Sequence, residues 1–145
     1  MDKREWATLI LRVVLGVIFM LHGSQKLFGV FAGAGPTGLG AYFTKIGIQP
    51  GLFWAWIVTI VEFVGGSFLI FGFLTRYAAA LLIIDMTVAV FWVHFPVFFW
   101  QRAGRLAPGG LEMPMTLGFI ALSLVLSGAS FLSVDRALGL EKRVD

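Results

Sequence analysis

Four long apolar segments constrain the fold of this chain most strongly. They cover residues 6–28, 53–74, 77–100 and 111–132. Each is long enough to cross a bilayer, which takes about 20 mostly apolar residues in a helix. An isolated strand cannot satisfy its backbone hydrogen bonds in lipid, whereas a helix can. The sequence therefore predicts an all-α membrane protein, a bundle of four transmembrane helices in a single domain that covers residues 1–145.

The composition supports this prediction and excludes several functions. Hydrophobic residues make up 59% of the chain and charged residues 13%, whereas about 25% of a soluble domain is charged. A chain of 145 residues has too little interior to hide so much apolar surface, so we expect membrane lipid to cover the rest. The net charge of +3 forms no basic face, and we therefore expect no nucleic-acid partner. The absence of cysteine excludes a disulfide relay, a thiolate metal site or an iron–sulfur cluster built from this chain.

The connection between the first two segments, residues 29–51, contains a shorter helical pattern. Leu39, Phe43 and Ile46 recur at helical spacing, which predicts a short helix over residues 37–48 that lies at the membrane surface. Residues 33–38 match G-x-G-x-x-G. Because a membrane helix and not a strand precedes this match, we interpret it as a flexible loop and not as a dinucleotide site.

No small-x-small cleavage motif follows the first segment, so we expect it to stay in the protein and not to be removed as a signal peptide.

Basic residues predict the orientation of the chain in the membrane. Four spans place both termini on one side, which we call the inner side. Seven basic residues lie there and four on the outer side: Lys3, Arg4, Arg12, Arg76, Arg136, Lys142 and Arg143 against Lys26, Lys45, Arg102 and Arg105. This excess favours cytoplasmic termini.

Several motifs occur in order along nearly the whole chain. They are LRVVLG (11–16), HGSQKLFG (22–29), EFVGG (62–66), GFLTR (72–76), Glu112 before Pro114, and SGASFLSVD (127–135). Together they resemble the DoxX family of small bacterial membrane proteins. The resemblance implies a four-helix protein of the bacterial inner membrane. It also implies a link to quinone-dependent oxidation, because the related DoxD proteins resemble subunits of quinone oxidoreductases. Gly128-Ala129-Ser130 departs from the Gly-x-Gly of many members.

Ionisable residues inside the predicted spans are the candidate functional groups, because each costs several kcal/mol there unless it is paired or hydrated. They are Arg12, His22, Lys26, Glu62, Asp85, His94 and Glu112. Helical spacing places two sets on common faces: Arg12, Gly16, Phe19, Gly23 and Lys26 with His22 at the edge, and Glu62, Gly66, Leu69, Phe73 and Arg76 with Gly65 beside them. Small residues let helices approach closely, so we expect these two faces to meet inside the bundle.

The depth of each group predicts two clusters. In the outer half we expect His22, Lys26, Glu62, His94 and Glu112 to converge. In the inner half we expect Arg12 to pair with Asp85. Asp85 and His94 are nine residues apart, which places them on opposite faces unless the third helix is bent.

A quinone pocket is one interpretation of the outer cluster. His22 and Lys26 are candidate hydrogen-bond donors to the head group and Glu62 a candidate proton carrier, so these three are the catalytic candidates. The predicted binding residues are Arg12, Phe19, Phe63, Asp85, Trp92 and Glu112. The alternative is that Glu62 and its basic partners only neutralise one another and fix the helix register. A bis-histidine haem at His22 and His94, or a metal at His22, Glu62 and Glu112, fits less well, and we predict no metal site.

Three functional classes therefore remain open. The first is a quinone-linked redox component, one subunit of a larger oxidoreductase complex. The second is a non-catalytic scaffold that recruits soluble redox enzymes. The third is a small-molecule transporter, for which four helices suffice only in a homo-oligomer and for which the chain shows no internal repeat. The predicted partners are lipid, quinone, and other redox subunits or further copies of the chain.

Overall fold

The computed structural model describes residues 2–95 and 110–141. Its elements, in chain order, are α1 (Lys3–Phe28), α2 (Gly35–Lys45), α3 (Gly51–Phe71), α4 (Thr75–Val88), η1 (Ala89–His94), α5 (Glu112–Ser127) and α6 (Val134–Ala137). Every regular element in these two stretches is a helix, as predicted. Residues 96–100 of the predicted third span and the loop before the fourth lie outside the described residues, apart from Gly110.

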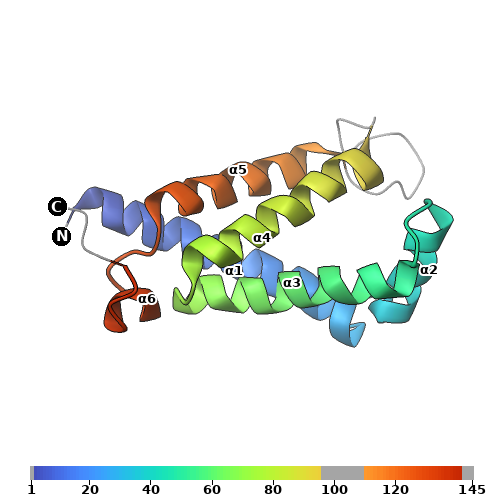
Figure 1. The fold of residues 1–145 in the computed structure, drawn as a ribbon, viewed down its shortest axis with the longest axis horizontal. Coiled ribbons are helices and arrows are strands. Elements are labelled where there is room, and N and C mark those ends of the chain that lie inside the picture. The colour runs from blue at the N-terminus through green and yellow to red at the C-terminus, as the bar shows by residue number, and fades with distance from the viewer. Residues whose placement is uncertain (1, 96–109, 142–145) are drawn as a thin grey trace.

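Three of these helices are long and apolar enough to cross a membrane. They are α1 with 26 residues, α3 with 21, and the continuous helix formed by α4 and η1 with 20. The fourth, α5, is apolar but has only 16 residues. Helix α1 packs on α3, α4 on both α3 and α5, and α5 also contacts α1. The helices run along the long axis of the molecule, so they form a bundle (Figure 1).

The predicted fourth span is too long at its C-terminal end. The sequence predicted helix to residue 132, but α5 ends at Ser127 because Gly128 takes a positive φ of 74°. The following segment is irregular, yet Ala129 and Ser130 are buried in the protein. Non-helical backbone at membrane depth is tolerated where protein covers it. Helix α3 also ends early, at Phe71, where Gly72 adopts the left-handed conformation.

The core lies between α1, α3, α4 and α5. Its fully buried side chains include Leu15, Phe19, Leu69, Leu82 and Leu124. The outward faces of the same helices are apolar as well, for example at Ile10, Phe71 and Leu126. Apolar residues both inside and outside are what a bundle in lipid requires, since neither face meets water.

Helix α2 lies at the end of the bundle opposite α6, beside the start of α3 (Figure 1). We call the end with α2 the outer end, and the end with α6 and the start of α1 the inner end. The contact is close: a Cβ on Gly40 would lie 2.8 Å from the Cα of Leu52. The predicted short helix is thus confirmed, with its limits shifted by two or three residues toward the N-terminus.

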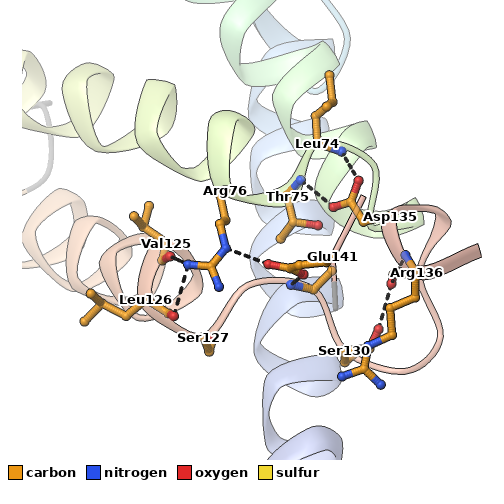
Figure 2. Close-up of polar contacts among 12 residues, drawn as sticks. Leu74, Thr75, Arg76, Val125, Leu126, Ser127, Ser130, Asp135, Arg136 and Glu141 are labelled. Atoms are coloured by element: carbon orange, nitrogen blue, oxygen red, sulfur yellow. Dashed lines mark hydrogen bonds and ion pairs between the residues drawn. The ribbon is translucent and has the colours of Figure 1, made fainter. Parts of the chain in front are cut away.

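The inner end is held together by carboxylates of the C-terminal segment (Figure 2). Asp135 accepts hydrogen bonds from the backbone N–H groups of Leu74 at 2.7 Å and Thr75 at 2.9 Å, at the start of α4. Glu141 accepts from Arg76 Nε at 2.6 Å and from the N–H of Ala129 at 2.5 Å. A carboxylate at a helix N-terminus satisfies N–H groups that have no partner within the helix. The segment after α5 therefore fixes the turn between α3 and α4.

Candidate functional site

Glycines bring α1 and α3 into backbone contact, and this contact positions the candidate site. A Cβ on Gly16 would lie 2.7 Å from the carbonyl oxygen of Gly66, and a Cβ on Gly66 would lie 2.5 Å from Met20 N. Gly23 meets the backbone of Phe63 in the same way. The two faces predicted from helical spacing therefore do meet. Lys26 lies one turn after Gly23 in α1. The contact between Gly23 and Phe63 therefore places Lys26 close to the part of α3 that contains Phe63.

Lys26 and Glu62 form an ion pair at this interface. Lys26 Nζ donates to Glu62 Oε1. The Glu62 side chain is only 3% exposed, while that of Lys26 is 26% exposed. Glu62 Oε2 is buried and has no hydrogen-bond donor among the described residues. The predicted inward orientation of Glu62 and its pairing with a basic residue of α1 are thus confirmed, and half of the carboxylate remains without a donor.

Asp85 lies beside Glu62, which corrects the sequence prediction. The two carboxyl groups are neighbours, and the Lys26 ammonium group, which pairs with Glu62, also lies near Asp85. Asp85 Oδ2 is buried and also has no donor in the described part of the chain. The depth explains the placement: Asp85 is 10 residues after Thr75 and Glu62 is 10 residues before Gly72, so both lie about 15 Å from the inner turn.

Arg12 does not pair with Asp85, so that prediction is wrong. The Arg12 side chain is buried at the inner end, where Nη2 donates to the carbonyl oxygen of Leu132 at 2.5 Å and Asp135 supplies the opposing charge. The guanidinium also packs against Gly72. Helix α4 starts at the inner end and rises, so Asp85 is a full half-span away from Arg12. Arg12 therefore belongs to the inner-end network and not to the candidate site.

His94 reaches the same cavity as Asp85, although simple helical spacing placed them on opposite faces. The last turn of the third span is a π-helix, Ala89–His94. In a π-helix each hydrogen bond spans one residue more than in an α-helix. The extra residue shifts the side chains after it around the helix axis by about 100° from the positions that a regular α-helix would give them. The Nδ1 atom of His94 lies 2.8 Å from the carbonyl oxygen of Ala89. The opposite-face placement that regular helical spacing predicts therefore does not hold here, because the helix is π-helical in this turn.

These groups surround a cavity of about 240 Å³ in the outer half of the bundle. Its polar lining comes from three spans: His22, Lys26, Glu62, Asp85 and His94. Its apolar lining includes Phe19, Val58, Met86 and Leu117, and Leu39, Tyr42 and Phe43 of α2 line its outer end. Ligand pockets usually begin at about 300 Å³. The cavity therefore has room for a single ring-sized group and not for a dinucleotide.

Besides Arg12, three predicted binding residues do not line this cavity. Phe63 packs against Phe28, with ring centroids 5.7 Å apart, on the other side of the α1–α3 contact. Trp92 is 61% exposed and faces outward, because the π-helix turns it away. Glu112 starts α5, and its backbone carbonyl accepts from Thr116 Oγ1 at 2.8 Å. Of the predicted binding residues, only Phe19 and Asp85 line the cavity.

Tyr42 is a site residue that sequence reasoning missed. Its hydroxyl-bearing ring lines the cavity together with its neighbours Leu39 and Phe43. The spacing of one turn between Leu39 and Phe43 was recognised as a helical face, and Tyr42 falls on the same face. The described residues contain no group of three or more His, Asp or Glu side chains arranged to hold a metal ion.

Comparison of the sequence with known proteins identifies the family of this chain. Residues 7–95 match the family model DoxX. The chain belongs to the DoxX family. All five polar residues of the cavity fall within the matched segment. The inner-end carboxylates of the C-terminal segment, Asp135 and Glu141, lie beyond it.

Relatives of this DoxX protein match along most of their length. A Bacillus subtilis (strain 168) protein named "Putative oxidoreductase CatD" is 30% identical over 131 residues, which cover 90% of this chain and 86% of that protein. The "Uncharacterized membrane protein Rv3486" of Mycobacterium tuberculosis is 32% identical over 142 residues, which cover 91% and 81%. An "Uncharacterized protein" of Haemophilus influenzae is 31% identical over 136 residues, covering 91% and 90%. No solved structure matched the chain. The family and its apolar helices make this a multi-pass membrane protein.

Proposed function

We propose that this DoxX protein is a quinone-linked component of a bacterial inner-membrane oxidoreductase complex, with a quinone head group bound in the cavity beneath α2. The observation that carries the proposal is the placement of Asp85. A purely structural ion pair needs one acid for Lys26, and Glu62 supplies it. Asp85 adds a second acid at the same depth, and each carboxyl group keeps a buried oxygen without a donor in the described part of the chain. A ligand that brings hydroxyl groups to these oxygens would satisfy them.

The residues of the cavity suit both forms of such a head group. Lys26 and His22 can donate to the carbonyl oxygens of a quinone, and the carboxyl groups of Glu62 and Asp85 can accept from the hydroxyls of a quinol. Two carboxyl groups and a lysine at the same depth are suited to giving and taking protons. The name of the Bacillus subtilis relative agrees with a role in oxidation.

The chain itself is proposed to bind, orient and exchange protons, while a partner subunit carries the electrons. A bound quinone supplies the two-electron, two-proton chemistry. Phe19 and Leu117 form apolar walls that keep water away from the polar groups, which strengthens their electrostatic action on a ligand. We also propose that both termini are cytoplasmic, so that this cavity lies in the outer half of the membrane.

Quinone binding to the purified protein tests the proposal. The protein is placed in lipid nanodiscs, and binding of water-soluble, tail-less ligands is measured by equilibrium dialysis with menadione and with a dimethoxy-methylbenzoquinone, each kept reduced to its quinol under anaerobic conditions. The quinol hydroxyls donate to the two carboxylates, so Glu62→Gln and Asp85→Asn each remove a charge-assisted hydrogen bond, which is worth about 1.5–3 kcal/mol. We therefore expect Kd to rise at least about tenfold for each variant. Glu141→Gln is the matched control, because it makes the same change at an ion-paired carboxylate of the inner end.

Two outcomes would overturn the proposal. One is a wild-type protein that binds neither quinol. The other is equal binding by the wild type, Glu62→Gln and Asp85→Asn. If soluble redox enzymes were then recovered in stoichiometric amounts after purification in mild detergent, a scaffold role would take its place.

A further inference from the structure

A second cavity lies next to the polar cavity, between α3 and α4. Its volume is about 170 Å³, and it shares Phe43, Val58, Asp85 and Val88 with the first. The rest of its lining is entirely apolar: Ile48, Trp54, Ile57, Val61, Leu81 and Ile84. Asp85 is the one charged residue in its described lining, and it also lines the polar cavity. We call the second cavity the α3–α4 crevice.

The α3–α4 crevice faces the surrounding lipid. Ile84 is 62% exposed and Leu81 is 52% exposed, although both line the crevice. Toward the inner end the crevice is closed, because Leu82 packs against Gly65, where a Cβ would be 3.5 Å from Leu82 Cγ. The crevice is therefore an opening confined to the outer half, at the same depth as the carboxyl pair.

The other surroundings of the polar cavity differ from the α3–α4 crevice. The backbone contact at Gly23 seals the space between α1 and α3. Tyr42 and Phe43 of α2 line the outer end. A wider apolar cavity of about 430 Å³ lies between α4 and α5, but it meets the polar cavity only at Met86 and Pro114, which are both buried. Among these cavities, the α3–α4 crevice is the apolar one that shares most lining residues with the polar cavity, and Asp85 is one of them.

We infer that the α3–α4 crevice holds the apolar tail of a membrane quinone whose head group lies at Asp85 and Glu62, and that the ligand enters sideways from the bilayer. This inference rests on the proposed function and adds to it the class of ligand, a long-tailed quinone. A site that is polar at one end and lined by branched aliphatic side chains at the other matches an amphiphile with one polar ring. The tail contributes to the affinity in proportion to the apolar area that it buries in the crevice. The polar ring fixes the orientation of the ligand in the site.

Photolabelling locates the tail. The probe is a quinone with a diazirine on the first carbons of its tail, bound to the full-length protein in nanodiscs and mapped by mass spectrometry. We expect label on residues 54–61 and 81–88, and we expect excess decylubiquinone or phylloquinone to compete with it. Ile84→Trp places an indole over the crevice and should reduce this label at least tenfold. Met115→Trp is the matched control, because Met115 is also exposed but lines only the α4–α5 cavity.

The outcomes separate this inference from the proposed function. Tail-less quinones should bind the wild type and Ile84→Trp equally, since the head-group site is intact, and thermal unfolding should confirm that both variants fold. Label on residues 115–122, or loss of label only in Met115→Trp, would overturn the inference by placing the tail between α4 and α5. Label spread evenly over all lipid-facing segments would overturn it by placing the tail in bulk lipid. Failure of tail-less quinones to bind the wild type would instead refute the proposed function.

Discussion

Two adjacent glycines of α3 should respond in opposite ways to the same substitution. Gly65 and Gly66 are both buried in the bundle. A Cβ on Gly66 would lie 2.5 Å from Met20 N and 2.8 Å from the Gly16 carbonyl oxygen, which are backbone atoms of α1. A Cβ on Gly65 would lie 3.5 Å from the Leu82 side chain, an ordinary contact. Gly66→Ala therefore forces two helices apart, whereas Gly65→Ala fills available space.

The magnitude follows from the distances. Carbon atoms pack best at about 3.5–4.0 Å, so Gly66→Ala requires roughly 1 Å of separation between α1 and α3. Overpacking costs about 1–3 kcal/mol, and the upper end applies because backbone cannot rotate out of the way. Replacing Gly by Ala within a helix stabilises the helix by about 1 kcal/mol, because alanine has the higher helix propensity. We expect Gly66→Ala to lower the free energy of unfolding by about 2 kcal/mol, and Gly65→Ala to raise it by up to about 1 kcal/mol.

Reversible unfolding in mixed micelles of mild detergent and dodecyl sulfate measures both changes, with thermal unfolding as a second readout. For a chain of this size 1 kcal/mol corresponds to about 2–4 °C in Tm. Gly66→Ala should therefore lower Tm by about 4–8 °C, while Gly65→Ala should leave it unchanged or raise it. Equal shifts in the same direction would refute the argument, because they would show that the α1–α3 backbone contact is not as close as described.

Three further predictions concern charge and orientation. Lys26→Met should destabilise the protein by roughly 3 kcal/mol, because it leaves Glu62 and Asp85 buried without a cation, whereas the triple variant Lys26→Met/Glu62→Leu/Asp85→Leu should unfold close to the wild type; a triple variant worse than Lys26→Met would contradict this. Asp135→Ala should lower the unfolding free energy by about 1–3 kcal/mol, since two buried N–H groups at the start of α4 lose their acceptor; an unchanged Tm would count against that role. The chain has no cysteine, so single cysteines can be labelled without background. Lys45→Cys should react with an impermeant maleimide in spheroplasts, and Asp2→Cys should react only after lysis. The reverse pattern would show that the orientation is opposite to the proposed one.

The sequence predicted the helices well because lipid imposes one simple rule. An apolar segment of sufficient length must be helical, so α1 and α3 were predicted to within about three residues at each end. Helical spacing also predicted which faces of α1 and α3 point into the bundle. Glu62 points inward, as the neighbouring glycines on its face indicated. The end of α5 was missed because an apolar segment continues past Gly128. Hydrophobicity cannot distinguish an apolar helix from irregular backbone that the protein itself covers.

The site was predicted only in part, because its completion depends on one irregular turn and on relative depth. No residue pattern in Ala89–His94 signals a π-helix, yet this turn brings His94 to the cavity and turns Trp92 away from it. Asp85 was assigned to the inner half because the predicted span extended to residue 100, which placed the middle of that helix too far along the chain. Counting from the inner turn at Gly72 gives the correct depth. Turns are therefore better references than segment centres for aligning charges across a bundle.

The two ends of the bundle use carboxylates differently, and the difference locates function. At the inner end three carboxylates each accept two hydrogen bonds: Asp135 accepts from two backbone N–H groups, Glu141 from Arg76 and the N–H of Ala129, and Glu5 from Arg136 and the N–H of Phe131. At the cavity one lysine faces two acids, and an oxygen of each lacks a donor among the described residues. Selection for stability alone would not place a second acid there, because a buried acceptor without a donor costs about 1–3 kcal/mol. Asp85→Leu should therefore leave the bundle as stable as the wild type or more so while abolishing quinone binding, whereas a purely structural Asp85 would make the same variant less stable.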